Sequence, residues 1–193
     1  MCRPIRVLLV EDDPDFRMLM RGMIRETSDL ELAGEACCKE EAVSCAAALQ
    51  PDIVLMDLKL SSADMDGIPA AKQIRLDTRA KVIIVTGFED RDITLEACKK
   101  SFASGYIYKS QRLLLVPTIR QTAAGLTPTE IFIQSLMLAE LSTAERTVFH
   151  FMTGAPVQLI SSEKTIANQK TSIFRKLGVK NSQELIHLFG SSS

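Results

Sequence analysis

The sequence contains no long hydrophobic run and no cysteine pattern of a disulfide-stapled or zinc-binding protein. No apolar stretch approaches the ~18 residues that cross a bilayer, and the N-terminus lacks the hydrophobic segment of a secretory signal peptide. The cysteines are odd in number and form no CxxC pair: Cys2, Cys37, Cys38, Cys45 and Cys98. This pattern indicates neither a disulfide framework nor a zinc site, so we expect a cytoplasmic protein that does not contact membranes.

The chain also lacks a strong charge of either sign and a phosphate-binding P-loop. Its 23 basic and 24 acidic residues give a net charge of -1, so any contact with nucleic acid must depend on a local basic cluster. The absence of GxxxxGK[ST] argues against nucleotide hydrolysis. A length of 193 residues, 46% of them hydrophobic and 24% charged, is typical of one large or two small globular domains.

Short apolar runs bounded by turn residues are typical of strands buried on both faces. Such runs, the second of them weaker, occur at Ile5–Val10, Leu30–Ala36, Ile53–Asp57, Lys81–Thr86 and Tyr106–Tyr108. Helices are predicted between these strands: one that begins at Pro14, and three over Glu40–Leu49, Ile68–Asp77 and Arg91–Ser101. A further helix after the last strand ends at Gly125, and Pro117 should delay its start. Strands that alternate with helices predict an α/β domain over residues 1–125, with a doubly wound parallel sheet.

The remaining residues predict helices only. Capping boxes, in which a Ser or Thr is followed three residues later by Glu, occur at Thr127–Glu130 and Ser142–Glu145. Ser162 is a candidate N-cap for a helix over Glu163–Leu177, Gly178 follows its expected end, and a last helix is expected over Ser182–Phe189. We therefore predict a linker helix over residues 126–141 and a small all-α domain over residues 142–193.

Polar side chains follow or end four of the predicted strands. Glu11 and Asp12 follow the first, Asp57 ends the third, Thr86 ends the fourth and Lys109 follows the fifth. Because the carboxyl ends of parallel strands meet at one edge of the sheet, we expect these groups to lie together. Taken singly they have plainer roles: the acidic group as a cap for the helix from Pro14, and the others as ordinary strand-end residues.

Together these groups suit phosphoryl chemistry. Three carboxylates repel one another and need a cation, and an all-oxygen set that leaves room for water suits Mg²⁺. A carboxylate beside Mg²⁺ can attack a phosphoryl group and become an aspartyl-phosphate. We expect Asp57 to be that nucleophile, with the Lys109 ammonium and the Thr86 hydroxyl stabilising charge on the phosphoryl oxygens.

Residues 3 to 125 resemble the receiver domain of two-component response regulators through Glu11-Asp12, Asp57, Thr86 and Lys109. The resemblance implies a flavodoxin-like five-stranded sheet and a histidine kinase as the phosphoryl donor. It implies that the backbone carbonyl of Lys59 is a further metal ligand, and that Tyr106 is a switch aromatic that turns inward after Thr86. Asp13 falls in the family's variable position, where it can cap the first helix.

The segment after the phosphoacceptor departs from the family pattern. The residues from Leu60 to Met65 form a longer connection than is usual and lack its proline. This change removes no catalytic group. We expect it to alter either the lifetime of the phosphoryl group or the access of the kinase.

Residues Leu141 to Phe189 resemble the helix-turn-helix output domain of LuxR-type regulators, which places the whole chain with the NarL/FixJ family. Ile166, Ile173 and Leu177 mark the buried stripe of the candidate recognition helix. The resemblance implies an outward face that enters the major groove, made of Lys164, Ala167, Asn168, Thr171 and Arg175. Between residues 163 and 180 only Glu163 opposes the basic residues Lys164, Lys170, Arg175, Lys176 and Lys180. The alternative is a solvated cationic face on a helical bundle.

The output half also departs from its family. The interval from Gly154 to Ser162 is too short for the usual scaffold helix, and we expect about one turn from Pro156 to Ile160. Either Val157, Leu159 and Ile160 replace the missing turns, or the domain has lost ordinary DNA docking; Gln169 also replaces a histidine common in the family. In the last helix, Leu185, Ile186, Leu188 and Phe189 form an apolar face, which either pairs two protomers or packs in the core.

The leading hypothesis is a response regulator whose phosphorylation on Asp57 promotes homodimerisation and DNA binding. The phosphoryl group would pull Thr86 and Tyr106 inward and alter the face around Arg91 to Ser101. The alternative keeps the switch but gives the helical domain a protein partner. A phosphohydrolase is disfavoured because such enzymes commonly carry a second carboxylate two residues after the nucleophile, where this chain has Lys59. We expect only slow hydrolysis of its own aspartyl-phosphate.

Overall fold

The computed structural model describes residues 3–60, 65–159 and 161–190, in two compact units, Met1–Ile133 and Gln134–Ser193. Two predictions concern residues outside these ranges: the longer loop between Leu60 and Met65 includes residues 61–64, and the predicted turn after Pro156 includes Ile160. No helix in the described ranges is long and apolar enough to cross a membrane.

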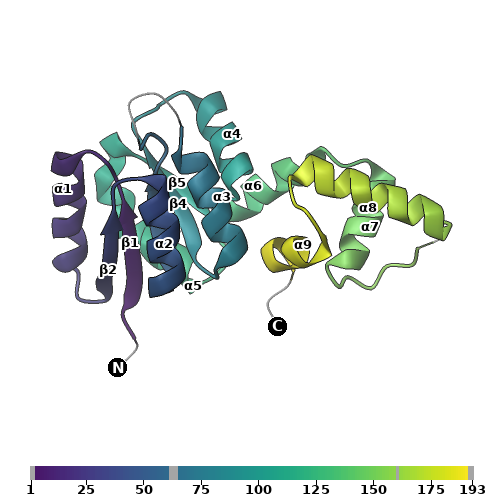
Figure 1. Cartoon of the computed structure of the whole chain (residues 1–193), viewed down its shortest axis with the longest axis horizontal. Helices are drawn as coiled ribbons and strands as arrows, with labels where there is room; N and C mark the ends of the chain where they lie inside the picture. Colours follow the sequence, from purple (N-terminus) through teal and green to yellow (C-terminus); the bar gives the residue numbers. More distant parts are fainter. Residues whose placement is uncertain (1–2, 61–64, 160, 191–193) are drawn as a thin grey trace. The chain divides into compact units, whose positions relative to one another are not determined.

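The first unit contains a five-stranded parallel sheet, as predicted. Its strands are β1 (Ile5–Val10), β2 (Leu30–Ala36), β3 (Ile53–Asp57), β4 (Lys81–Thr86) and β5 (Gly105–Tyr108). They lie in the order β2-β1-β3-β4-β5, and every pair is parallel (Figure 1). This order confirms the flavodoxin-like fold, in which the chain reverses its winding direction beside β1 and β3.

Helices lie between the strands and after the last one, at the predicted places. They are α1 (Pro14–Arg25), α2 (Lys39–Leu49), α3 (Gly67–Asp77), α4 (Arg91–Ser101), α5 (Leu115–Ala124) and α6 (Pro128–Ala139), with a 3₁₀ helix η1 (Lys109–Leu114) before α5. Pro117 lies inside the first turn of α5, where its missing N–H removes no hydrogen bond. The start of α5 is therefore delayed as expected, with η1 filling the interval.

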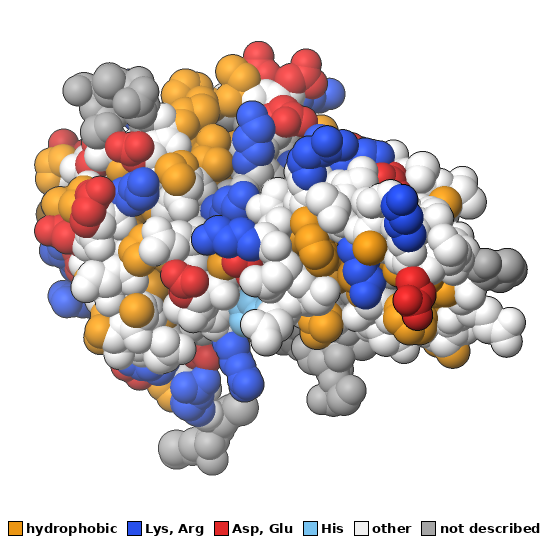
Figure 2. Space-filling view, turned by 45° about the vertical axis from the view of Figure 1, so that its right-hand side comes forward, with side chains coloured by type: hydrophobic (Ala, Val, Ile, Leu, Met, Phe, Trp, Pro, Cys, Tyr) orange, Lys and Arg blue, Asp and Glu red, His pale blue; other side chains and the backbone are white. Residues whose placement is uncertain are grey.

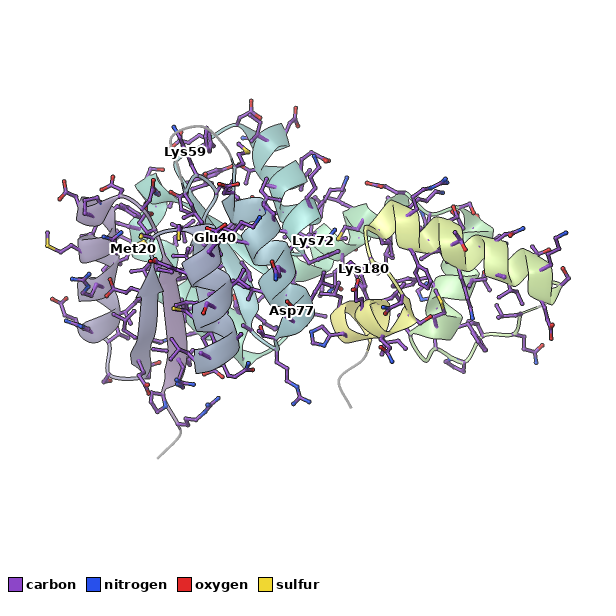
Figure 3. The ribbon with its side chains drawn as sticks, viewed as in Figure 1. Met20, Glu40, Lys59, Lys72, Asp77 and Lys180 are labelled. Carbon is purple, nitrogen blue, oxygen red and sulfur yellow. The ribbon has the colours of Figure 1, made fainter. Side chains whose placement is uncertain are left out.

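Both faces of the sheet are covered. On one face, Met20 and Ile24 of α1 and Leu115 and Ile119 of α5 pack against inward residues of the strands (Figure 3 labels Met20). Strand residues alternate between faces, so Leu8, Val54, Met56 and Ile84 point to the other side, and all are fully buried. The buried alanines of α2 and α3 and Ile74 belong to the helices there. Burial on both faces explains why the central strands are uninterrupted apolar runs.

The second unit is helical, with α7 (Thr143–Met152), α8 (Glu163–Leu177) and α9 (Ser182–Phe189). Ser142 and Glu145 form the predicted capping box at the start of α7. Ser162 caps α8 through the N–H of Thr165, and Gly178 follows α8 in the left-handed conformation (φ 70°) that glycine adopts without strain. These local signals are confirmed.

The expected turn from Pro156 to Ile160 is wrong for the residues described. No helix is present between Met152 and Glu163 at residues 153–159 and 161–162. Instead, the chain makes an irregular path with turns, in which the N–H of Ala155 donates to the carbonyl of His150 (2.9 Å) and the N–H of Val157 donates to the carbonyl of Ala155 (2.8 Å). Ala155, Val157 and Leu159 are half-buried along this path. A single helical turn gains too few hydrogen bonds to offset the ordering of its backbone, and Gly154 and Pro156 disfavour it further.

Most of the apolar face of α9 packs inside the second unit. Leu185 and Leu188 are buried, and the ring of Phe189 lies edge-on to that of Phe149, with 5.5 Å between centroids. Of the four apolar residues predicted to form this face, only Ile186 is exposed (48%). Core packing therefore accounts for the greater part of this face.

Candidate functional site

Three acidic side chains gather at the carboxyl end of the sheet. The register pairs Val10 with Met56, so Glu11 follows β1 beside Asp57, the last residue of β3. Glu11 and Asp57 are buried (1% and 5% exposed), whereas Asp12 is exposed. One carboxylate oxygen from each of the three lies within 4.8 Å of the others. The spacing suits a shared divalent cation with part of its coordination open to solvent.

The ammonium of Lys109 reaches the two buried carboxylates. Its Nζ lies 2.7 Å from Glu11 Oε2 and 2.9 Å from Asp57 Oδ2, and 4.6 Å from the centroid of the Phe16 ring. Burial alone would lower the pKa of Lys109, but the hydrogen bonds that its ammonium donates to Glu11 and Asp57, together with their negative charge, outweigh this effect and raise the pKa. Lys109 therefore stays charged beside the phosphoacceptor candidate.

One ammonium does not neutralise the three carboxylates. Burial raises the pKa of Glu11 to about 7, with a further contribution from the charge of Asp57 and against the lowering effect of Lys109. A buried carboxylate with a raised pKa is stabilised in its charged form by added positive charge. An all-oxygen, anionic donor set of this kind fits Mg²⁺.

Lys59 lies at the same edge (Figure 3). Its backbone N–H lies 3.3 Å from Asp57 Oδ1, a long hydrogen bond that helps to orient the carboxylate. The role of its carbonyl as a metal ligand stays a prediction.

Thr86 and Tyr106 occupy neighbouring strands. Thr86 ends β4, is fully buried, and its Oγ1 accepts a hydrogen bond from the N–H of Phe88 (3.1 Å). Tyr106 is 39% exposed on β5, and its ring packs edge-on against Tyr108 with 5.7 Å between centroids. In this structure the hydroxyl is inside the fold and the aromatic ring is at the surface.

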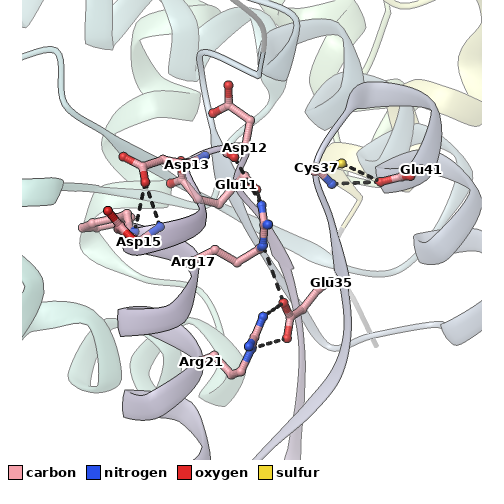
Figure 4. A network of polar contacts seen from close by, with 10 residues as sticks. Glu11, Asp12, Asp13, Asp15, Arg17, Arg21, Glu35, Cys37 and Glu41 are labelled. Atoms are coloured by element: carbon pink, nitrogen blue, oxygen red, sulfur yellow. Dashed lines mark hydrogen bonds and ion pairs between the residues drawn. The ribbon is translucent and has the colours of Figure 1, made fainter.

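Asp13 and Arg17 organise the loop that carries the acidic pair (Figure 4). Asp13 Oδ1 caps α1 by accepting from the N–H groups of Asp15 (2.9 Å) and Phe16 (3.2 Å), so Asp13, not the acidic pair, is the cap. Arg17 donates from Nη1 to the carbonyl oxygens of Glu11 (2.6 Å) and Asp12 (3.3 Å).

Arg17 is itself positioned by an ion pair with Glu35 on β2. Its Nε lies 3.8 Å from Glu35 Oε2, and Arg21 binds the same carboxylate through two hydrogen bonds of 2.7 and 2.6 Å. This network fixes the backbone on which Glu11 and Asp12 stand. Sequence reasoning missed Arg17, since an arginine on a surface helix carries no signal of its own.

Gly67 is a second residue whose role at the site was not predicted from the sequence. A Cβ atom built on Gly67 would lie 1.9 Å from the carbonyl oxygen of Asp57 and 2.8 Å from Cα of Leu58. The N–H of Gly67 donates to the carbonyl of Leu58 (3.1 Å). Only glycine allows the start of α3 to lie against the backbone of the phosphoacceptor candidate.

In the second unit, the residues proposed to face DNA are all exposed: Lys164, Ala167, Asn168, Thr171 and Arg175. Ile173 and Leu177 are buried and Ile166 is half-buried, as expected for the inner stripe. The right-hand part of Figure 2 shows lysine and arginine side chains among uncharged ones and a few acidic ones.

Two details of α8 differ from the simple picture of a basic face. The Nζ of Lys176 lies 2.7 Å from Glu145 Oε2, so this lysine is engaged within the unit. Gln169, at the position of the family's histidine, has a buried Oε1 with no hydrogen-bond partner in the described part of the chain.

Comparison with known proteins identifies the first unit. The family model of the response regulator receiver domain matches residues 7–117, more than half of the chain. The transcriptional regulatory protein LiaR of Bacillus subtilis is 35% identical over 122 residues, which cover 63% of this chain and 57% of LiaR. The response regulator protein VraR of Staphylococcus aureus is 38% identical over 126 residues, with coverage of 63% and 57%. The chain thus spans less than two thirds of the length of these relatives.

Solved structures extend the likeness. A LuxR-family two-component response regulator from Aurantimonas is 31% identical, with a TM-score of 0.58 over 71% of this chain and 99% of the other. The RcsB response regulator of Salmonella typhimurium aligns over 96% of both chains with a TM-score of 0.57; at 21% identity this shows the fold alone. With the match of residues 7–117 and the helical unit that follows, the chain belongs to the response regulator receiver family and is of the NarL/LuxR type.

Proposed function

We propose that this protein is a transcription regulator switched by phosphorylation of Asp57, with a histidine kinase as the donor. The observation that carries the proposal is the pairing of the Glu11–Asp12–Asp57 cluster, within 4.8 Å, with the ammonium of Lys109 on Asp57. Asp57 is buried enough to be shielded from bulk water and sits on a rigid strand, which favours attack on a positioned phosphoryl group.

The residues divide the work of phosphoryl transfer. Glu11, Asp12, Asp57 and the carbonyl of Lys59 would hold Mg²⁺, which neutralises charge on the phosphoryl oxygens when bound. A carboxylate oxygen of Asp57 forms the new P–O bond as the P–N bond to the donor imidazole breaks, and the departing imidazole takes up a proton. Lys109, already 2.9 Å from Asp57, binds an oxygen of the transferred group. The reaction needs no group able to activate an external substrate, so we propose a phosphoacceptor with slow self-dephosphorylation only, not an enzyme.

The switch follows from the same contacts. Thr86 Oγ1 already accepts from the N–H of Phe88, which leaves its proton for an oxygen of the phosphoryl group. Movement of Thr86 toward Asp57 vacates space at the end of β4, and Tyr106 turns inward from its exposed position. The altered face around α4 then favours a homodimer, and pairing raises the effective concentration of the output units on DNA.

The test compares wild type with Asp57→Asn in acetyl phosphate and Mg²⁺. Phosphorylation is followed by phosphate-affinity gel mobility, and assembly by size-exclusion chromatography with light scattering. Asp15→Asn, an exposed aspartate in the first turn of α1, is the control. We expect phosphorylation and dimerisation in wild type and the control only. An Asp57→Asn protein that is phosphorylated and dimerises like wild type would refute the proposal.

A second candidate function keeps the switch and replaces DNA by a protein partner. The irregular, non-helical segment at residues 153–159, in place of a scaffold helix, is the observation that favours it. Mobility of the full-length protein on genomic DNA fragments, with and without beryllofluoride and Mg²⁺, separates the candidates. Failure to bind DNA at low salt in both states would favour the protein partner.

A further inference from the structure

A buried carboxylate lies at the other end of the sheet from the phosphoacceptor candidate. Glu130, in the first turn of α6, is only 4% exposed. Its Oε1 accepts from Ser104 Oγ (2.9 Å) and lies 3.6 Å from Nη2 of Arg75, and its Oε2 lies 3.1 Å from Nζ of Lys81. The sequence suggested only a local capping role for Glu130, but its carboxylate makes contacts with distant segments.

Two partners of Glu130 lie at the amino ends of the two strands that carry the switch residues. Lys81 is the first residue of β4, whose last residue is Thr86. Ser104 directly precedes β5, which carries Tyr106 and leads into Lys109. One carboxylate therefore joins the amino ends of both strands.

Neighbouring hydrogen bonds close this cluster. The hydroxyl of Thr127 donates to the carbonyl of Ser104 (3.3 Å) and accepts from the N–H of Glu130 (3.1 Å). Arg75 donates to the carbonyl oxygens of Phe102 (3.0 Å) and Ala80 (3.2 Å), just before β5 and β4. The first turn of α6 is thus bound to both strands by directional contacts in a buried place.

A buried ionic cluster of this kind holds a geometry more than it adds stability, because desolvation offsets much of the ion-pair attraction. If one of these contacts breaks, a buried charge loses its partner, which costs free energy. Movement of the strands relative to the first turn of α6 is therefore unfavourable. The helix α6 continues past Ile133, the last residue of the first unit, into the second.

We propose that Glu130 couples β4 and β5 to the helix that leads into the output unit. A displacement of these strands when Thr86 and Tyr106 respond to phosphorylation changes the positions of Lys81 and Ser104, and Glu130 transmits it to α6. Glu130 is a positioning residue in this scheme and takes no part in the phosphoryl transfer. The inference rests on the proposed function, since it needs a phosphorylated Asp57 as its input.

The test is hydrogen exchange of the α6 amides in the full-length protein, before and after phosphorylation by acetyl phosphate with Mg²⁺. The variant Glu130→Gln retains the size of the side chain and removes the charge, and Glu26→Gln, an exposed glutamate after α1, is the matched control. We expect wild type and the control to show a phosphorylation-dependent change in α6 exchange of severalfold. In Glu130→Gln we expect the rate of phosphorylation to stay within about twofold of wild type, while the change in α6 is lost.

The outcomes separate the two proposals. A Glu130→Gln protein that is phosphorylated and shows the wild-type change in α6 overturns the coupling alone. A wild type that is not phosphorylated refutes the proposed function, and the coupling fails with it. Should Glu130→Gln unfold, Ser104→Ala removes only the side-chain hydrogen bond between Ser104 and Glu130. The expected result is a reduced α6 response at an unchanged rate of phosphorylation, and a full response would overturn the coupling.

Discussion

At the scale of single residues, the charge around Asp57 is set by contacts that cross the sheet edge. Lys109 binds Glu11 and Asp57 at once, and its ammonium also lies over the ring of Phe16. Among the described residues, Lys109 is the cation that pairs with these two carboxylates. A divalent cation bound on the side of Asp12 would neutralise the remaining negative charge of the cluster.

Arg17 should determine how well that cation binds. Arg17→Met removes the hydrogen bonds to the carbonyl oxygens of Glu11 and Asp12. The backbone that positions these two side chains for the cation is then less well fixed. We expect Mg²⁺ affinity, measured by isothermal titration calorimetry, to fall by about tenfold, as for other supports of metal ligands. Arg25→Met, at the end of α1, should leave affinity unchanged. Equal affinities in both variants would contradict this role of Arg17.

Gly67 should be sensitive to a single methyl group. In Gly67→Ala the added Cβ meets the backbone of Asp57 and Leu58, which cannot move aside as a side-chain end can. We expect a loss of about 1–3 kcal/mol in the free energy of unfolding, measured by urea denaturation, together with slower phosphorylation. Gly22→Ala, in α1 with nothing within 4 Å of its Cβ, should instead gain about 0.5–1 kcal/mol. A neutral Gly67→Ala would show that the contact is not close in solution.

At the scale of elements, α7 and α8 are joined by the capping glutamate. Glu145 Oε2 accepts from the N–H of Ser142 (2.7 Å) and pairs with Lys176 Nζ (2.7 Å). The hydrogen bonds from Lys176 first, and then from Ser172 and Ser142, lower the pKa of Glu145 to about 2. The same carboxylate therefore starts α7 and holds the last turn of α8, in a unit that lacks a scaffold helix at residues 153–159.

This contact should make the second unit sensitive to acid. Because the pKa of Glu145 is depressed in the folded state, its stabilisation is present above the ordinary value of 4.5 and is lost as pH falls from there through about 2. Chemical denaturation followed by circular dichroism should show a stability difference between wild type and Glu145→Gln that shrinks over this range. Glu163→Gln, an exposed glutamate of α8, is the control for the loss of one negative charge. A difference that stays constant with pH would contradict the assignment.

At the scale of the whole molecule, a receiver unit and a helical unit divide the functions. The first unit carries the acidic cluster and Lys109, and the second carries the exposed basic and polar residues of α8. The chain as a whole has a net charge of -1, so attraction to DNA would come from one helix and not from the total charge.

That distribution predicts a modest salt dependence of DNA binding. Arg175 is exposed on α8, so Arg175→Ala should weaken binding of the phosphorylated protein and reduce the slope of log K against log salt by about one. The measurement is fluorescence anisotropy at several salt concentrations. Lys176→Ala is the comparison: its partner is Glu145, so its main effect should be on stability. An unchanged salt slope in Arg175→Ala would argue that α8 does not contact phosphates.

The sequence by itself determined the sheet, its parallel winding and the chemical groups at its edge. Buried strands need apolar residues on both faces, and the polar residue after each run marks where the strand ends, so Asp57 and Lys109 were predictable from local pattern. Helix caps such as Ser162 and Gly178 were predictable for the same reason, since their partners lie within a few residues.

The tertiary structure alone decided how those groups are supported. Arg17 holds the acidic loop, Gly67 lies against Asp57, and Glu130 joins two strands to α6, yet each is locally an ordinary residue. Lys176 counted as part of a basic face until its pairing with Glu145 was seen, 31 residues away in the sequence. An irregular path at residues 153–159 likewise stands where a helical turn was predicted. Contacts between distant segments depend on the packing of whole elements, and no local pattern of residues encodes them.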